Sequence, residues 1–343
     1  MLATESLPQC SFCYREEALG KKSKRMIENE RHDDLLRELD KKTVNPPVYL
    51  DLRLGNKCNL KCRTCNPLFS SAWSDEVKNH PENSAIQSYA SQVTTVSSYK
   101  DWYSNPKTWE SVSDYCDDLR EVYLTGGEPM LIKEHELFLK QMVASYKSQN
   151  IHLRYNTNLT VLPDYATQYF PHFKKVTLSC SIDGIQERNE WLRHPSRWTA
   201  IEENLKRACL LPKNVIVEVN CAISAYNILH FADLVVFFAN FSKAQNRKIE
   251  VSADLVHEPE VMNLKVLPTD LQINAAVLLE KLLRDEELNL TKHEKREIKS
   301  LILLLQDRLA DRCELWPKLV EHTREIDHVR GQRIASLFPE LGL

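Results

Sequence analysis

The sequence predicts an α/β protein centred on a partial (β/α)6 barrel, similar to a TIM barrel with fewer strands. Two observations support this fold class. Six short apolar runs have the length and composition of β-strands, and helical patterns lie between most of them. Such alternation is typical of parallel βαβ units. The same periodicity also fits a doubly wound sheet, which is the alternative fold.

The predicted strands begin with Val48–Leu54, where leucines alternate with charged residues. The other five apolar runs are Val122–Thr125, Ile151–Asn156, Val176–Ser181, Val215–Ala222 and Ile249–Leu255. Examples of the helical patterns between them are Glu134–Ser148, Thr199–Leu211 and Ile228–Asn240. These elements place a core domain at residues 48–260.

Three regions lie outside this alternation. Residues 1–47 form an N-terminal extension that contains Cys10 and Cys13. An insertion at residues 80–115 is polar but rich in tyrosine and tryptophan, and we expect either a lid over a binding site or a surface flap with its own small core. Residues 261–343 are predicted to form a C-terminal helical segment that packs on the barrel.

The composition excludes several classes of protein. The chain has 45 basic and 48 acidic residues and a net charge of −3, so nothing indicates a nucleic-acid partner. No apolar stretch is long enough to span a bilayer, and the first residues lack the pattern of a signal peptide. We therefore expect a cytoplasmic protein without a membrane partner. In a reducing compartment, clustered cysteines indicate metal binding or catalysis rather than disulfides.

A Cys-x3-Cys-x2-Cys motif, formed by Cys58, Cys62 and Cys65, follows the first predicted strand. Loops at the carboxyl ends of parallel strands build the active sites of α/β proteins. With ten cysteines in 343 residues, chance would produce this spacing about 0.01 times. Three thiolates can hold three irons of a 4Fe-4S cluster and leave the fourth iron open. The alternative is a structural zinc with His80 or Cys116 as its fourth ligand.

Gly126, Gly127 and Glu128 follow the second predicted strand. Two of the chain's seven glycines are adjacent here, and glycine lets the backbone come close to a ligand. A strand-end carbonyl together with the Glu128 carboxylate can bind an ammonium group. Zinc binding does not explain this second motif.

Together the two motifs resemble those of the radical S-adenosylmethionine (radical SAM) superfamily. The resemblance implies a 4Fe-4S cluster whose open iron binds the amino and carboxylate groups of S-adenosylmethionine. Reductive cleavage of the cofactor would give a 5′-deoxyadenosyl radical, which abstracts a hydrogen atom from the substrate. It also implies a reductant such as a flavodoxin or ferredoxin. The sequence identifies no further catalytic residue.

Later stretches resemble the branch with anaerobic sulfatase-maturating enzymes and peptide-modifying relatives, which implies a peptide or protein substrate. They are Asn156-Thr157-Asn158 after the third strand and Ser179-Cys180-Ser181-Ile182-Asp183-Gly184 at the end of the fourth. By this resemblance Ser181 and Arg193 would contact the methionine carboxylate, which a guanidinium pairs with well. Asn158 and Asn220 would reach the adenosine part. The family often has an aromatic residue before the third cysteine, where this chain has Thr64.

The stretch Cys10-Ser11-Phe12-Cys13-Tyr14 resembles part of the cysteine-rich twitch or SPASM regions that bind an auxiliary iron–sulfur cluster in some relatives. Residues 1–47 would then be the remnant of such a region. These regions normally supply more than two cysteines, so a cluster here would need further ligands. A vestigial pair and a zinc clip are the alternatives.

Two other functions fit the sequence. One is a non-catalytic iron–sulfur or zinc-binding interaction module that uses the aromatic insertion as its contact surface. The other is a radical SAM enzyme that acts on a nucleotide or small metabolite. Gly126–Glu128 distinguishes the module, because a module has no need of a methionine-ammonium site. Five isolated cysteines are expected to be small buried hydrophobic residues: Cys116, Cys180, Cys209, Cys221 and Cys313.

Overall fold

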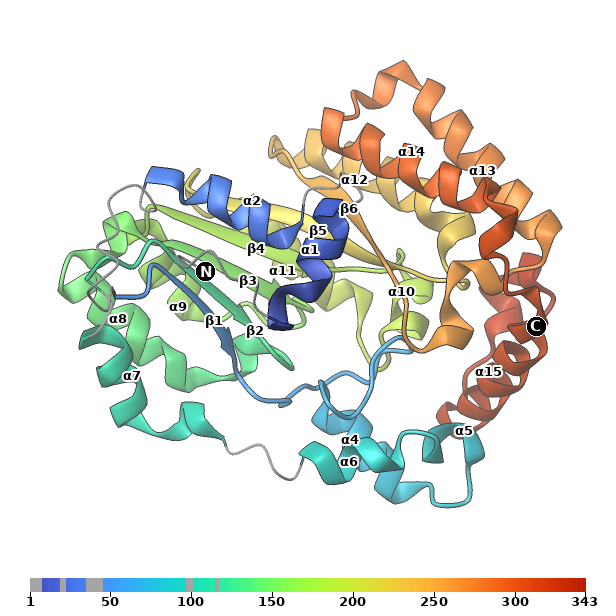
Figure 1. Cartoon of the computed structure of the whole chain (residues 1–343), viewed down its shortest axis with the longest axis horizontal. Coiled ribbons are helices and arrows are strands. Elements are labelled where there is room, and N and C mark those ends of the chain that lie inside the picture. Colours follow the sequence, from blue (N-terminus) through green and yellow to red (C-terminus); the bar gives the residue numbers. More distant parts are fainter. Residues whose placement is uncertain (1–7, 19–22, 35–45, 97–100, 115–116) are drawn as a thin grey trace. The chain divides into compact units, whose positions relative to one another are not determined.

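The computed structural model describes residues 8–18, 23–34, 46–96, 101–114 and 117–343, and Figure 1 shows it as a ribbon. The chain divides into two compact units, Met1–Pro47 and Val48–Leu343. The described part of the first unit contains α1 (Ser11–Ala18) and α2 (Lys24–Arg31). Ser23 caps α2, and its hydroxyl also donates to the Glu17 carboxylate of α1. Glu17 and Arg25 form an ion pair as well, so these contacts join the two helices.

The second unit is built on a parallel sheet with the strand order β1-β2-β3-β4-β5-β6 (Figure 1). In the described residues the strands are β1 (Tyr49–Arg53), β2 (Glu121–Thr125), β3 (His152–Thr157), β4 (Lys175–Ser181), β5 (Val215–Ile223) and β6 (Glu250–Leu255). All six predicted strands are present. Their sequential order excludes the doubly wound alternative, in which the order reverses at a switch point. The predicted α/β class, with a partial barrel of six parallel strands, is confirmed.

Alternate residues of each strand face a layer of helices, as expected for period-two side chains. Val122 of β2 and Leu153 of β3 are fully buried there and belong to the same core cluster as Phe138 of α8. The helices of this part are α8 (Glu136–Ala144), α9 (Asp164–Tyr169), α10 (Glu187–Leu192), α11 (Trp198–Cys209) and α12 (Phe231–Gln245). The intervening residues, such as Tyr123 and Arg154, are polar and only partly buried. The other face of the sheet is therefore polar.

The aromatic insertion is packed into the fold. After α4 (Ser71–Asn79) it contains α5 (Ser84–Gln87), α6 (Ala90–Val96) and α7 (Pro106–Asp114). Tyr89 is buried in a small cluster with Trp73 of α4 and Ile326 of the C-terminal helix, while Tyr103 and Trp109 are buried in the main core. A flap with a small core is thus closer to the structure than a covering lid, although that core is shared. Cys116, an alternative zinc ligand, lies outside the described residues, as do Tyr99 and Tyr115 of the insertion.

The C-terminal helices are α13 (Thr269–Arg284), α14 (Lys292–Gln306) and α15 (Trp316–Arg330). They pack on the barrel as predicted, because α13 contacts α14 and α14 contacts β6 (Figure 1). Leu279 and Leu305 are fully buried in the main core. No helix in the described ranges is long and apolar enough to cross a membrane. Among the isolated cysteines, Cys180, Cys209 and Cys221 are buried as predicted, whereas Cys313 is partly exposed.

Candidate functional site

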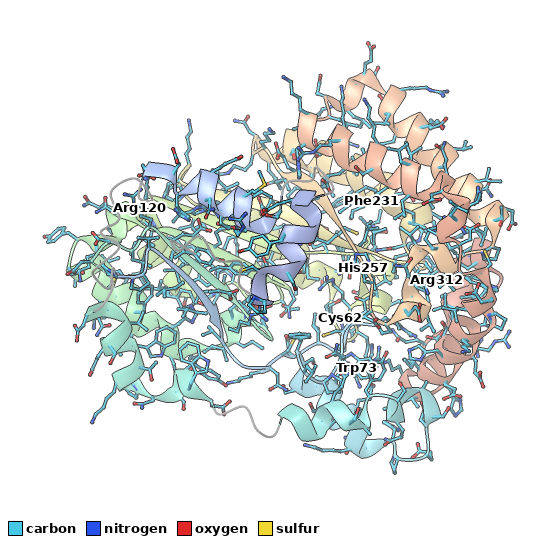
Figure 2. All side chains as sticks on the ribbon, viewed as in Figure 1. Cys62, Trp73, Arg120, Phe231, His257 and Arg312 are labelled. Atoms are coloured by element: carbon cyan, nitrogen blue, oxygen red, sulfur yellow. The ribbon has the colours of Figure 1, made fainter. Side chains whose placement is uncertain are left out.

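The cysteine motif lies in the loop between β1 and α4, and the first turn of α4 fixes the loop backbone. The Ser71 hydroxyl accepts a hydrogen bond from the Cys58 N–H and donates to its carbonyl, each at 3.1 Å. The Ser70 hydroxyl, which also caps α4, donates to the Leu60 carbonyl at 2.5 Å. The Trp73 indole donates to the Cys62 carbonyl at 2.8 Å, and Figure 2 shows these two residues close together.

Gly126 and Gly127 lie against the backbone of this cysteine loop. The N–H groups of Gly127 and Glu128 donate to the carbonyls of Gly55 and Lys57 at 2.9 and 2.8 Å. A Cβ atom at Gly126 would lie 2.7 Å from the Gly55 oxygen, and one at Gly127 would lie 2.3 Å from the Lys57 oxygen. Gly126 also has a φ of +127°, which L-residues rarely adopt. The sequence predicted that the backbone at Gly126 and Gly127 comes close to a ligand. In the structure this backbone lies against the cysteine loop.

The buried Glu128 carboxylate, only 1% exposed, connects the loop after β2 to the end of β3. One carboxylate oxygen accepts hydrogen bonds from the Met130 N–H (3.0 Å) and the Thr157 hydroxyl (2.7 Å). The other accepts from the Asn158 N–H (2.5 Å). Burial raises the pKa of Glu128 to about 7, against the lowering effect of these hydrogen bonds and of Arg193. The predicted ammonium partner is therefore also a structural link.

Arg193 lies beside the central cysteine. Its Nε atom is 2.8 Å from one Asp183 carboxylate oxygen, and Nη2 donates to the other at 3.0 Å. The third nitrogen, Nη1, lies 3.8 Å from the Cys62 sulfur. Burial disfavours the cation, but attraction to Asp183 and Cys62 outweighs this, so the pKa of Arg193 is raised. Arg193 thus keeps its charge and already has one carboxylate partner.

Backbone pairing explains why Arg193 meets Cys62. The N–H of Lys61 donates to the carbonyl of His194 at 2.7 Å, and the N–H of Arg63 donates to the carbonyl of Leu192 at 2.8 Å. The residues on both sides of Cys62 are therefore bonded to the residues on both sides of Arg193. This pairing joins segments 130 residues apart, and no local pattern in the sequence indicates it.

The remaining predicted residues are Asn158 just after β3, Ser181 at the end of β4 and Asn220 within β5. The Asn158 amide nitrogen donates to the Asn59 side chain at 3.0 Å and lies 3.8 Å from the Cys58 sulfur. Ser181 ends β4 and pairs in register with Asn220 of β5. Asn220 donates to Asp254 at 2.7 Å and is not among the residues that line the central cavity.

A central cavity of about 390 Å³ brings together nine of the ten residues predicted for the cluster and its cofactor; the tenth, Asn220, does not line it. The nine are Cys58, Cys62, Cys65, Gly126, Gly127, Glu128, Asn158, Ser181 and Arg193. This volume lies in the range of small-molecule sites, roughly 300–1,000 Å³. The sequence did not single out two other lining residues, Phe69 and Glu258. Two sequence signals could have indicated them: Phe69 is an apolar residue just after the cysteine motif, and Glu258 follows the sixth strand.

Cys62 is buried and Cys58 and Cys65 are partly buried, and the Arg193 cation lies 3.8 Å from the Cys62 sulfur. Burial raises the pKa of Cys58 to about 12, and it also raises those of Cys62 and Cys65. Metal binding must therefore displace thiol protons. Within the described residues, no three or more His, Cys, Asp or Glu side chains are grouped to hold one metal ion. His80, a proposed zinc ligand, contacts Glu82 instead and is not on the cavity wall. Three thiols round a cavity suit a multi-iron cluster better than one zinc ion.

A second cavity, also of about 390 Å³, adjoins the first. The residues that line both are Phe69, Thr125 and Gly126. Trp102 of the insertion lines the second cavity, and its indole donates to the Arg53 carbonyl at 3.0 Å. The Tyr123 hydroxyl accepts from the Asn156 amide at 2.6 Å, which links the walls of the two cavities. The insertion thus reaches the site through Trp102.

Cys10 and Cys13 belong to the first unit. Cys10 ends a short 3-10 turn, Pro8–Cys10, and Cys13 lies in α1, three residues later. Both thiols are partly exposed and neither is in a disulfide. Their spacing places them on neighbouring positions of one helical surface.

No family model matches the chain, and no curated protein matches it. Among solved structures, SuiB of Streptococcus suis bound to S-adenosylmethionine has a TM-score of 0.46 and 16% identity over 81% of this chain and 58% of its own. SuiB bound to the precursor peptide SuiA has a TM-score of 0.43 and 16% identity over 81% and 60%. Native anSMEcpe with bound AdoMet has a TM-score of 0.49 and 18% identity over 71% and 62%.

The chain spans less than two thirds of the length of each of these proteins. At these identities and TM-scores the similarity does not extend to activity, and the function is inferred from the site's own residues.

Proposed function

We propose that this chain is a radical SAM enzyme that holds a 4Fe-4S cluster on Cys58, Cys62 and Cys65. One observation carries this proposal. The three thiols line the same cavity as Gly126–Glu128 and Arg193, which come from separate strand ends and loops. A metal-binding interaction module would need the cysteines but not the second set of residues. An enzyme that binds an amino-acid-bearing cofactor beside the metal would use both.

The residues fit such a cofactor in their chemistry. When bound, the cluster and S-adenosylmethionine supply a 5′-deoxyadenosyl radical that abstracts a hydrogen atom from the substrate. The chain would orient the cofactor between opposite charges: the Glu128 carboxylate suits an ammonium group, and the Nη1 atom of Arg193, which lies beside the Cys62 sulfur and not on Asp183, suits a carboxylate. Ser181 would donate a further hydrogen bond, and Asn158 would contact the sugar. The buried walls would exclude water from the reacting atoms.

We propose a peptide or protein as the substrate, with a flavodoxin or ferredoxin as the reductant. The second cavity supports this substrate class because it adjoins the first and has room for one amino-acid side chain. Its walls combine aromatic rings with the main chain of Gly55 and Gly126. An auxiliary iron–sulfur cluster on Cys10 and Cys13 is part of the same proposal and requires additional ligands.

The test is anaerobic reconstitution with iron and sulfide, followed by addition of dithionite and S-adenosylmethionine. We expect 5′-deoxyadenosine from the wild-type protein; the Cys58→Ala, Cys62→Ala, Cys65→Ala triple variant should form no product and should lose the iron held by this loop. Cys313→Ala is the matched control, because this thiol is partly exposed and outside the cavity. An unchanged iron content and EPR signal in the triple variant would refute the cluster assignment. Product formation stimulated by a small-metabolite fraction and not by a peptide fraction would refute the substrate class.

A further inference from the structure

Two basic residues, Lys61 and Arg63, flank Cys62 in the cysteine loop, and both form ion pairs with buried carboxylates. Arg63 is completely buried, and its Nη2 atom donates to the Asp327 carboxylate and to Gln332. Lys61 contacts the fully buried Glu76 carboxylate at 2.5 Å. A buried ion pair costs desolvation energy and is therefore weak evidence for added stability. Its position next to a proposed cluster ligand indicates a functional role.

Both ion pairs lead to one face of α15. Asp327 is on this helix, and Arg330 lies one turn further along it. Arg330 donates to both oxygens of Glu76, at 3.1 and 2.6 Å. Glu76 therefore bridges Lys61 and Arg330. Arg63 is therefore held directly by a residue of α15, 264 positions away in the sequence, and Lys61 is linked to the same helix through Glu76 of α4.

The Asp327 carboxylate is the centre of the first pair. The Trp191 indole donates to the same oxygen that Arg63 contacts, at 2.9 Å, and the Ile334 N–H donates to the other oxygen at 2.8 Å. The Arg63 guanidinium stacks on the Trp191 ring, with its central carbon 3.7 Å from the ring centroid. A planar guanidinium held by stacking and by a carboxylate has a fixed orientation.

Four cations and four carboxylates lie around the cysteines. The cations are Lys61, Arg63, Arg193 and Arg330, and the carboxylates are Glu76, Asp183, Asp327 and, on the cavity wall, Glu128. The two nearby imidazoles, His194 and His322, add no positive charge near neutral pH, because burial and neighbouring arginines lower the pKa of each to about 4. Reduction of an iron–sulfur cluster adds a negative charge, which a neighbouring positive charge stabilises.

We infer that Asp327 and Arg330 are positioning residues of the cluster site, which hold the cysteine loop through Lys61 and Arg63 and set the reduction potential of the cluster. This inference rests on the proposed function. It makes the C-terminal helix part of the redox site, although α15 contributes no ligand to it. Removing a carboxylate from the network should raise the potential, and removing a cation should lower it.

The experiment is an EPR-monitored redox titration of the reconstituted full-length protein. Asp327→Asn keeps an acceptor for Trp191 and removes one negative charge, so we expect a higher midpoint potential than in the wild type. Arg330→Gln removes one positive charge, so we expect a lower one. Glu202→Gln changes an exposed pair with Lys206 on α11 and serves as the control, with an unchanged potential. Iron content and far-UV circular dichroism show whether each variant is folded and loaded.

Opposite shifts of the midpoint potential in Asp327→Asn and Arg330→Gln would support the inference. A purely structural role would lower iron content or stability in both variants but would not move their potentials in opposite directions. Potentials equal to the wild-type value in folded, loaded variants would overturn it and leave the proposed function intact. If the wild-type protein binds no cluster, the proposed function itself fails. If Asp327→Asn does not fold, Lys61→Gln provides the test, since this partly exposed cation should also lower the potential when removed.

Discussion

The Glu128 carboxylate accepts a 2.5 Å hydrogen bond from the backbone N–H of Asn158, which ties the loop after β2 to the end of β3. Glu128→Gln removes the negative charge and replaces one acceptor oxygen by an NH2 group. Because both oxygens of Glu128 accept hydrogen bonds, this NH2 group would face a hydrogen-bond donor. We expect cluster binding to persist and S-adenosylmethionine affinity to fall about 10- to 100-fold, the usual loss for a charged hydrogen bond. Equilibrium dialysis with the reconstituted protein measures this, with exposed Glu134→Gln as the control. Wild-type affinity in Glu128→Gln would contradict the role.

The raised pKa of Glu128 predicts a pH dependence of stability. The pKa is about 7 in the folded protein against an ordinary value of 4.5, so the folded state holds this proton more tightly. The resulting stabilisation is complete below about pH 4.5 and is lost as the pH rises through about 7. Relative to Glu128→Gln, the unfolding free energy of the apoprotein should fall by about 2–3 kcal/mol across this window. Urea denaturation at several pH values tests it; a constant difference would show that Glu128 has the same pKa in the folded and unfolded states.

Phe69 is predicted to stack on the adenine ring of S-adenosylmethionine, a contact that Thr64 cannot make because it has no ring. Its side chain is 47% exposed, and it lines the central cavity four residues after Cys65. Stacking on an aromatic ring contributes about 0.5–1.5 kcal/mol. Phe69→Ala should therefore weaken S-adenosylmethionine binding about 2- to 10-fold without changing iron content. Leu309→Ala, at a fully exposed side chain, is the control. If binding in Phe69→Ala equals the wild type, the adenine ring lies elsewhere.

The two tryptophans of the insertion should respond differently to substitution. Trp109 is fully buried against Phe138 and His135, so Trp109→Ala should destabilise the fold by about 3–5 kcal/mol, measured by urea denaturation. Trp102 is only partly buried and lines the second cavity, so Trp102→Ala should leave S-adenosylmethionine cleavage intact and impair substrate turnover. Equal effects on cleavage and turnover would show that Trp102 does not act on the substrate.

Cys10 and Cys13 are predicted to be dispensable for radical generation, because the loop around Cys62 already supplies three ligands and the fourth iron must stay open. The Cys10→Ala, Cys13→Ala double variant should retain uncoupled 5′-deoxyadenosine formation. Reduced iron with retained cleavage would indicate an auxiliary cluster, and unchanged iron would favour a vestigial pair. Loss of cleavage in folded protein would contradict the separation of the two cysteine groups.

Local patterns made the strands and the two motifs predictable. The alternation at Val48–Leu54 has a period of two, and the cysteine spacing is too specific to arise often by chance. The sequence predicted the partial barrel but did not exclude a doubly wound sheet, because strand pairing depends on contacts between distant segments. For the same reason, the sequence alone did not indicate that Arg63 pairs with Asp327 or that Arg193 meets Cys62. Gly126 and Gly127 were singled out because glycine lets the backbone come close to a ligand. In the structure the atoms nearest to them belong to the backbone of the cysteine loop.

The backbone of the cysteine loop forms many of its hydrogen bonds with other parts of the chain: with Ser70 and Ser71, with Gly127 and Glu128, and with the carbonyls of Leu192 and His194. A short peptide with the same Cys-x3-Cys-x2-Cys spacing would therefore carry the ligands without their arrangement. The loop can reach its final shape only after the second strand and the segment around Arg193 are in place. Iron–sulfur insertion should accordingly follow barrel formation during maturation. In a chain that ends before residue 194, the cysteines would lie in a loop without its final shape and would be open to oxidation.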